Sequence, residues 1–268
     1  MKEIKFIEKL IRQAYKKCIL SVSREDMDVD NHIKDHNNHS YDFATICDLA
    51  VENYLKTAIA KRYPNDKFIC EESENKSLTD DRTWIIDPID GTINFYHNIP
   101  MWCIQLALME NKECKLSVIF CPGTNEMYVA NEHGAWCNGK PLSVNKNIPV
   151  KKAIFNMCGL MQKNEYFYNM QMHLVTSLGQ QLAKVKMFGS AGFEYCCVAS
   201  GRVHAYWVTC KTIWDWLPGK FICEKAGCSI LERDILGNKM IAACANDEIK
   251  HVIEKEINNY INSKKKSN

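Results

Sequence analysis

The segment TWIIDPIDGT, residues 83–92, constrains this chain more than any other part of its sequence. An apolar run leaves a buried strand and delivers two carboxylates, three residues apart, around a proline. Pro88 fixes its own φ and restrains Asp87 to an extended conformation, so Asp87 and Asp90 can converge on one point. Gly91 permits close approach of the backbone, and the N–H groups after it are placed to begin a helix that faces an anion.

Two carboxylates at the end of a buried strand need an explanation, because a buried and unpaired charge is costly. Hard divalent cations prefer oxygen ligands of this kind, and Mg2+ commonly bridges carboxylates and a substrate phosphate. The sequence therefore predicts a divalent-metal site at Asp87 and Asp90. The alternative, in which both are turn or cap residues, stays open because Asp is common at such positions.

Three further acidic positions favour the metal site. The strand segment FICEE places Glu71 at its end, and Asp215 lies in WDWLPG directly before a predicted helix. Asp48 lies on another predicted helix. Asp215 also fits a plain helix N-cap with Pro218 in the first turn, and Asp48 also fits an exposed helix residue.

Composition favours a soluble globular protein. The 268 residues are 46% hydrophobic and 25% charged, which suffices for a substantial core. The net charge of +2 gives no electrostatic argument for nucleic acid or an anionic membrane. No apolar run approaches the roughly 20 residues of a membrane span, and the amphipathic N-terminus is unlike a signal peptide. Fourteen cysteines without a Cys-x-x-Cys predict buried thiols in a reducing compartment, so we expect a cytoplasmic protein.

Apolar periodicity predicts helices over residues 4–18 and 44–63, the second ended by Pro64. The polar residues 22–40 predict a surface loop, whose alternating Asp26, Asp28 and Asp30 do not complete a calcium loop because an Asn stands where Gly is needed. Asn138-Gly139 predicts a tight turn. Strands are predicted over 67–70, 83–87, 102–109, 115–120, 126–130, 153–157, 184–188, 203–208, 228–231 and 240–244.

The rhythm of the elements changes near residue 150. Strands follow one another before it and alternate with helices after it, which predicts an α+β half over 1–150 and an α/β half over 151–268. No linker or repeat separates the halves. We therefore expect one catalytic unit over 1–268, with most metal ligands in the first half and with Asp215 and the substrate contacts in the second.

Taken together, FICEES, WIIDPIDGTINFYH and WDWLPG resemble, in order, the motifs of the inositol monophosphatase family of magnesium-dependent, lithium-sensitive phosphatases. The resemblance runs from Asp42 to about Gly227. It implies the layered αβαβα sandwich of the sugar phosphatases and a homodimer.

The resemblance also assigns roles to individual residues. It implies metal ligation by Glu71, Asp87, the main-chain carbonyl of Ile89, Asp90 and Asp215, with two or three Mg2+ per active site. It implies catalytic roles for Asp48, Thr92 and Glu71, of which Asp48 and Thr92 would orient the attacking water. The N–H groups of Gly91 and Thr92 would bind phosphate. Substrate contacts would come from Asp90, Gly189, Ser190, Ala191 and Asp215. Because no Ser or Cys stands in a nucleophile motif, direct attack by a metal-activated water is expected.

Several positions depart from the family pattern. Cys70 precedes the Glu pair where Gly is usual, Ile93 replaces a Thr, and Leu217 and Pro218 replace small alanines. Val208 stands where many members carry a Glu that hydrogen-bonds an inositol hydroxyl, which leaves the physiological substrate open.

Three functions follow as hypotheses. The leading one is hydrolysis of inositol monophosphate or a similar polyol or sugar phosphate, a small phosphorylated substrate. The second, favoured by Val208, is a phosphatase of the same superfamily that acts on NADP, fructose 1,6-bisphosphate or a 3′-phosphoadenosine nucleotide. The third is a partner-binding regulatory protein with secondary phosphatase activity.

Overall fold

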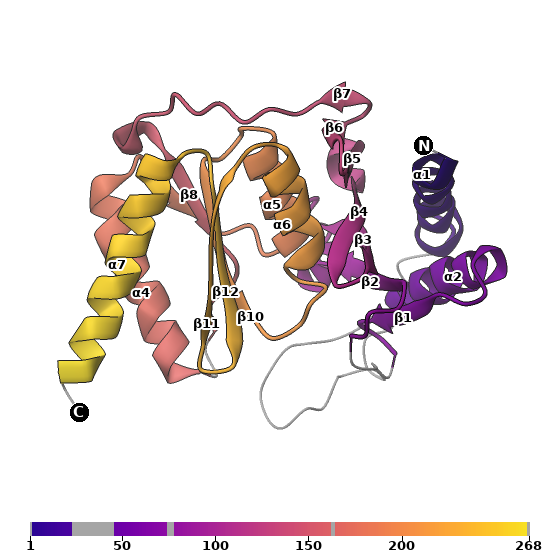
Figure 1. Ribbon diagram of the computed structural model, residues 1–268, viewed down its shortest axis with the longest axis horizontal. Helices are drawn as coiled ribbons and strands as arrows, with labels where there is room; N and C mark the ends of the chain where they lie inside the picture. The colour runs from indigo at the N-terminus through magenta and orange to yellow at the C-terminus, as the bar shows by residue number, and fades with distance from the viewer. Residues whose placement is uncertain (1, 23–45, 74–77, 162–163, 267–268) are drawn as a thin grey trace.

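The computed structural model of the chain describes residues 2–22, 46–73, 78–161 and 164–266. Layers of helices and sheets alternate in the order helix, sheet, helix, sheet, helix (Figure 1). The expected αβαβα sandwich is therefore confirmed. Apart from Val22, the predicted loop over 22–40 with Asp26, Asp28 and Asp30 lies outside the described residues, as do positions 44 and 45 of the predicted second helix.

The first sheet has seven strands in the order β1-β2-β3-β4-β5-β6-β7, of which only β1 and β2 are parallel neighbours among the described strands. Asn138 and Gly139 both have positive φ and form the predicted turn between β6 and β7. The strands are β1 (Lys67–Cys70), β2 (Thr83–Asp90), β3 (Cys103–Glu110), β4 (Glu113–Cys121), β5 (Glu126–Asn131), β6 (Gly134–Cys137) and β7 (Lys140–Pro141).

Two helices cover the outer face of this sheet. They are α1 (Lys2–Ala14), which a π-helix continues over Tyr15–Ile19, and α2 (Ile46–Arg62). Ile7 and Ile11 lie one turn apart on α1 and are fully buried in the cluster that α1, α2 and the sheet share. Pro64 follows the end of α2, as expected for a residue that cannot continue a helix.

The second sheet has five strands in the order β11-β12-β10-β8-β9, with β8 parallel to β9 and β10 and with β12 antiparallel to β10 and β11. Helices α4 (Glu165–Gln181) and α7 (Asp247–Lys266) cover its outer face (Figure 1). The strands are β8 (Ile154–Met157), β9 (Lys184–Lys186), β10 (Ala205–Cys210), β11 (Ser229–Ile235) and β12 (Asn238–Cys244).

Helices α5 (Ala191–Ala199) and α6 (Leu217–Lys225) lie between the two sheets and contact both of them. Every residue of α5 is buried. This helix is apolar on nearly all sides, which is the pattern of a helix enclosed by the core. Its one acidic residue, Glu194, is buried as well and is discussed below.

Several predicted strands of the second half have wrong bounds: the strand predicted over 228–231 is β11, at 229–235, and the one predicted over 240–244 begins at 238. For two others the hydrogen bonds give the reason. The strand predicted over 184–188 ends at Lys186, because the N–H groups of Phe188 and Gly189 donate to the carboxylate of Glu194 instead of a neighbouring strand. The strand predicted over 203–208 is β10, at 205–210, because the N–H of Val203 still donates to a carbonyl of α5.

The cysteines behave as small apolar residues. All fourteen lie in the described part of the chain as free thiols, ten of them buried and four partly buried. Among the described helices, none is both long enough and apolar enough to cross a membrane.

Candidate active site

A β-bulge brings the two aspartates of β2 onto one face of the sheet. Asp87 pairs with Gln105 and Asp90 pairs with Cys103, so β2 has two residues between the pairs where β3 has one. In a regular strand, residues three apart point to opposite faces, and one extra residue restores the same face. Pro88 sits in the bulge, where its missing N–H removes no ladder hydrogen bond.

The apolar neighbours confirm the direction in which the aspartates point. Ile86 and Ile89 belong to the cluster shared with α1 and α2 on the outer side of the sheet. Because side chains alternate along a strand, Asp87 and Asp90 face inward, toward α5. The strand predicted to end at Asp87 therefore continues through Pro88 to Asp90.

Asp90 is held by the first turn of α5. Its Oδ2 accepts from the hydroxyl of Ser190 at 2.6 Å and from the N–H of Gly192 at 2.6 Å, and its Oδ1 accepts from the N–H of Ala191 at 3.1 Å. The thiol of Cys103 also donates to Oδ2, at 3.3 Å. A carboxylate at a helix N-terminus satisfies N–H groups that have no partner inside the helix. Asp90 thus connects the first sheet to the middle layer.

Asp87 has a different environment. The side-chain amide of Gln105 donates to its Oδ2 at 2.9 Å. Its Oδ1 is buried and has no hydrogen-bond partner among the described residues. Asp87 is only 1% exposed, so bulk solvent does not reach its carboxylate. A buried carboxylate oxygen in this state is costly unless a cation or a donor arrives.

Glu71 and Asp215 lie next to Asp87. Glu71 follows β1, and its N–H donates to the carbonyl of Ile86 at 3.2 Å, which continues the parallel ladder beside Asp87. Asp215 lies between β10 and α6 and accepts from the hydroxyl of Thr212. Its neighbours Trp214 and Trp216 pack on the inner face of the first sheet. The alternative in which Asp215 is the N-cap of α6 is wrong, because Trp216 holds that position.

These carboxylates repel one another. Burial raises the pKa of Asp87 well above its ordinary value, and the charges of Glu71, Asp90 and Asp215 raise it further. Burial also raises the pKa of Asp90, against four hydrogen bonds that lower it. The charges of Glu71, Asp90 and Asp215 therefore all act on Asp87, and these four groups are called the acidic cluster below.

The acidic cluster fits a hard divalent cation by its chemistry. Its donors are oxygens, one of them, Oδ1 of Asp87, is buried and has no partner in the described part of the chain, and positive charge would relieve the repulsion. In the part of the chain that the structure describes, no three His, Cys, Asp or Glu side chains are already arranged around a metal position. Both oxygens of Asp90 accept hydrogen bonds from α5, and one oxygen of Asp215 accepts from Thr212.

Gly91 joins β2 to α3 (Thr92–Tyr96), the helix predicted to follow it. Its φ of 88° is the left-handed region that favours glycine. An added Cβ would lie 2.8 Å from Cβ of Ser190, so the segments at 91 and 189–190 touch. The hydroxyl of Thr92 donates to the carbonyl of Ile89 at 3.0 Å.

Sequence reasoning missed two residues that hold the segment 188–190. The carboxylate of Glu194 accepts from the N–H groups of Phe188 at 2.5 Å and Gly189 at 3.3 Å. The amide of Asn94 donates to the carbonyls of Phe188 and Met101, both at 2.6 Å. The available signal was a lone acidic residue in the apolar stretch AGFEYCCVA, which only a buried role explains.

Both Asp48 and Val208 are buried in the structure. Asp48 is fully buried on α2, so the alternative of an exposed helix residue is wrong. Val208 is 4% exposed and packs in the apolar cluster of α5 and the second sheet. Position 208 therefore offers no polar side-chain group.

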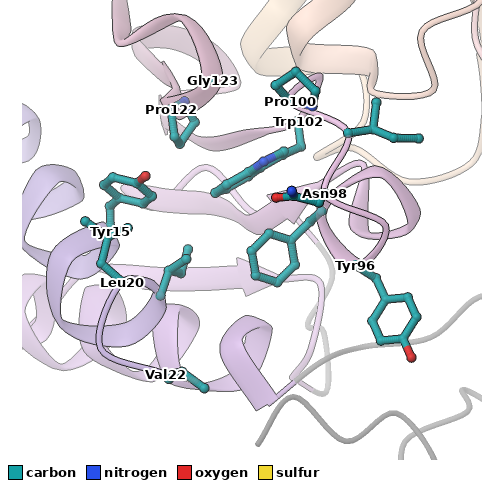
Figure 2. Close-up of a pocket in the computed structure, with 12 residues that line it drawn as sticks. Tyr15, Leu20, Val22, Tyr96, Asn98, Pro100, Trp102, Pro122 and Gly123 are labelled. Carbon is teal, nitrogen blue, oxygen red and sulfur yellow. The ribbon is translucent and has the colours of Figure 1, made fainter. Parts of the chain in front are cut away.

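A separate pocket of about 350 Å³ lies beside α3, which contributes part of its lining (Figure 2). Tyr15, Leu20, Pro100, Trp102 and Pro122 are among its lining residues, and none of the four clustered carboxylates lines it. This pocket is distinct from the candidate site.

Comparison with known proteins gives the following matches. The model of the inositol monophosphatase family matches residues 2–261. Inositol monophosphatase 1 of Bos taurus is 31% identical over 227 residues, which are 81% of this chain and 82% of that protein. An IMPase of Thermotoga maritima superposes with a TM-score of 0.83 at 26% identity, covering 98% of this chain and 99% of that one. A staphylococcal inositol monophosphatase-1, solved as a LiCl-soaked inhibitory complex, shares the fold with a TM-score of 0.77 at 22% identity, covering 93% and 94%.

Proposed function

Because this chain belongs to the inositol monophosphatase family, and is therefore a phosphoric monoester hydrolase of a metal-dependent kind, we propose that it hydrolyses a small polyol or sugar monophosphate with Mg2+ as the metal. Inositol monophosphate is the first substrate to test, since relatives about 31% identical to this chain carry that activity in their names.

We assign the metal to the acidic cluster. Glu71, Asp87 and Asp215 would hold Mg2+ together with Asp90 and the main-chain carbonyl of Ile89, for two or three ions per site. When bound, such ions lower the pKa of water and offset the negative charge of the phosphate and of the leaving oxygen. The observation that carries the proposal is the bulge, because it aligns Asp87 and Asp90 on one inward face.

The remaining roles belong to the chain itself. Asp48 and Thr92 would orient and help to deprotonate the attacking water, and the N–H groups of Gly91 and Thr92 would bind phosphate oxygens. The backbone at Gly189, Ser190 and Ala191 would face the hydroxyls of the substrate; its contact with Gly91 supports this placement. Phosphoryl transfer depends mainly on such positioning and charge stabilisation, so no covalent nucleophile is needed.

The test is phosphate release from a panel of phosphomonoesters, with and without Mg2+. Asp87→Asn and Asp90→Asn should each lower kcat by orders of magnitude, because each removes a formal charge from the acidic cluster. Circular dichroism should show both variants folded. Unchanged kinetics in both would refute the assignment of the site.

A second substrate class is favoured by Val208, whose apolar side chain offers no acceptor to a sugar hydroxyl. A site without that acceptor should prefer inositol phosphate over other substrates only weakly. The preference should be about 1–3 kcal/mol smaller than in a site that has the acceptor. The panel should therefore include NADP, fructose 1,6-bisphosphate and 3′-phosphoadenosine nucleotides. A strong preference for inositol phosphate would dismiss this alternative.

Three general properties complete the proposal. We expect a homodimer with one catalytic unit per chain, testable by light scattering, and we expect a cytoplasmic location, which the free thiols support. We expect inhibition by Li+, as described for the staphylococcal structure. Retention of a cellular phenotype by an inactive Asp90→Asn variant would instead favour the partner-binding role.

A further inference from the structure

Gln105 is a buried amide that faces the acidic cluster from β3. It is 0% exposed, and its Nε2 donates to Oδ2 of Asp87 at 2.9 Å across the antiparallel pair. Its neighbours along the strand are apolar on both sides, from Cys103 to Met109. Burying an uncharged polar side chain inside such a strand destabilises the folded protein unless its hydrogen bonds are made.

Packing alone does not account for this amide. The carbonyl oxygen of Gln105 has no hydrogen-bond partner among the described residues, so the side chain is satisfied on its donor side alone. The N–H side of the amide faces Asp87, whose Oδ2 accepts the hydrogen bond. The contact that compensates the burial of Gln105 is therefore the one with Asp87.

The middle layer fixes the amide from the other side. A Cβ added at Gly192 of α5 would lie 2.6 Å from Oε1 of Gln105. The glycine thus makes room for the amide, and the backbone of α5 closes the space in which the side chain could turn away. Both the ladder of β2 and β3 and the start of α5 hold the donor against Asp87.

We infer that Gln105 is a positioning residue for the metal site, in addition to the proposed ligands and resting on the proposed function. Its N–H binds Oδ2 of Asp87 and so leaves Oδ1, which has no partner among the described residues, for the cation. Groups that orient a metal ligand in this way affect metal affinity about 10- to 100-fold when they are removed. Gln105 itself touches neither the cation nor the substrate.

The test is Gln105→Met, which keeps the size of the side chain and removes the donor. The readouts are the Mg2+ concentration for half-maximal thermal stabilisation without substrate, the Mg2+ concentration for half-maximal activity, and KM at saturating Mg2+. The matched control is Gln181→Met. The amide of Gln181 donates to a carboxylate, Oε1 of Glu256 at 3.0 Å, between α4 and α7 and away from the site.

We expect both Mg2+ midpoints of Gln105→Met to rise about 10- to 100-fold, with KM at saturating Mg2+ within about twofold of wild type. Gln181→Met should leave both midpoints unchanged. If Gln105→Met does not fold, Gln105→Asn, which keeps an amide but withdraws it from Asp87, should raise both midpoints in the same direction. Midpoints within about twofold of wild type in the folded variant would overturn the inference alone. A wild type without any Mg2+ response would overturn the proposed function, and the inference with it.

Discussion

Gly192→Ala tests how tightly α5 is packed against the carboxylates of β2. The new Cβ would lie 2.6 Å from Sγ of Cys103, 2.6 Å from Oε1 of Gln105 and 3.1 Å from Oδ2 of Asp90. Non-bonded heavy atoms prefer about 3.5–4.0 Å, so α5 must retreat by about 1 Å. The hydrogen bond from its N–H to Asp90, now 2.6 Å, would then exceed about 3.5 Å and be lost.

The expected cost follows from three terms. Overpacking costs about 1–3 kcal/mol, and a lost hydrogen bond to a charged group costs about 1.5–3 kcal/mol when it is not replaced. The higher helix propensity of Ala returns about 1 kcal/mol. Together these terms give about 1.5–5 kcal/mol, so we expect Gly192→Ala to lose about 3 kcal/mol of unfolding free energy, to lower Tm by about 6–12 °C, and to lower kcat/KM at least about tenfold.

Denaturant titration and steady-state kinetics measure both quantities, and two further variants sharpen the result. Gly179 is an exposed glycine inside α4 where an added Cβ meets nothing within 4 Å, so Gly179→Ala should be neutral or stabilising by up to about 1 kcal/mol. Cys103→Ala removes one of the clashing atoms and should reduce the cost of Gly192→Ala by about 1 kcal/mol in a double-mutant cycle. A Gly192→Ala protein as stable and as active as wild type would refute the reasoning.

Three further outcomes are expected. Asp87→Asn should raise Tm by about 2–4 °C in EDTA, because burial and like charges raise the pKa of Asp87 in the folded state. Such an acid destabilises the folded protein once the pH exceeds the pKa of the same group in the unfolded chain. The gain in Tm should therefore vanish near about pH 4 and grow toward neutral pH, which melting curves across this range would reveal. Gly91→Ala should lower the free energy of unfolding by about 2 kcal/mol or more, because the new Cβ clashes with Ser190 and the residue must also keep a positive φ. Gly139→Ala has a similar φ but open space around the new Cβ, so it should cost only about 1–2 kcal/mol of backbone strain in the same denaturant titration. Thr212→Val removes the hydroxyl that donates to Asp215 and should raise the Mg2+ requirement of kcat/KM about tenfold, with Thr212→Ser close to wild type.

The sequence predicted the fold and the acidic segments but not the backbone that joins them. Pro88 reads as the end of a strand, because proline cannot donate to a ladder, and the predicted strand stopped at Asp87. The structure carries the strand to Asp90 through a bulge. A bulge depends on the register with β3, a long-range pairing that no local pattern contains.

The same limit explains why Gln105 was missed. Its strand reads as an apolar run, and its single amide acquires a meaning only once Asp87 stands opposite it. Glu194 is similar, because its partners at Phe188 and Gly189 are set by the fold of a loop. Residues that carry a motif can be found from sequence, whereas residues that support it depend on tertiary contacts.

The extra residue in β2 limits which mutations this site can accept during evolution. Along a strand, successive positions alternate between two sides, and the odd spacing of Asp87 and Asp90 works only with one irregular step between them. Adding or removing a single residue there would send one carboxylate toward α1 and α2. Side chains around the strand can be exchanged one by one, but the length of the backbone between the two aspartates cannot.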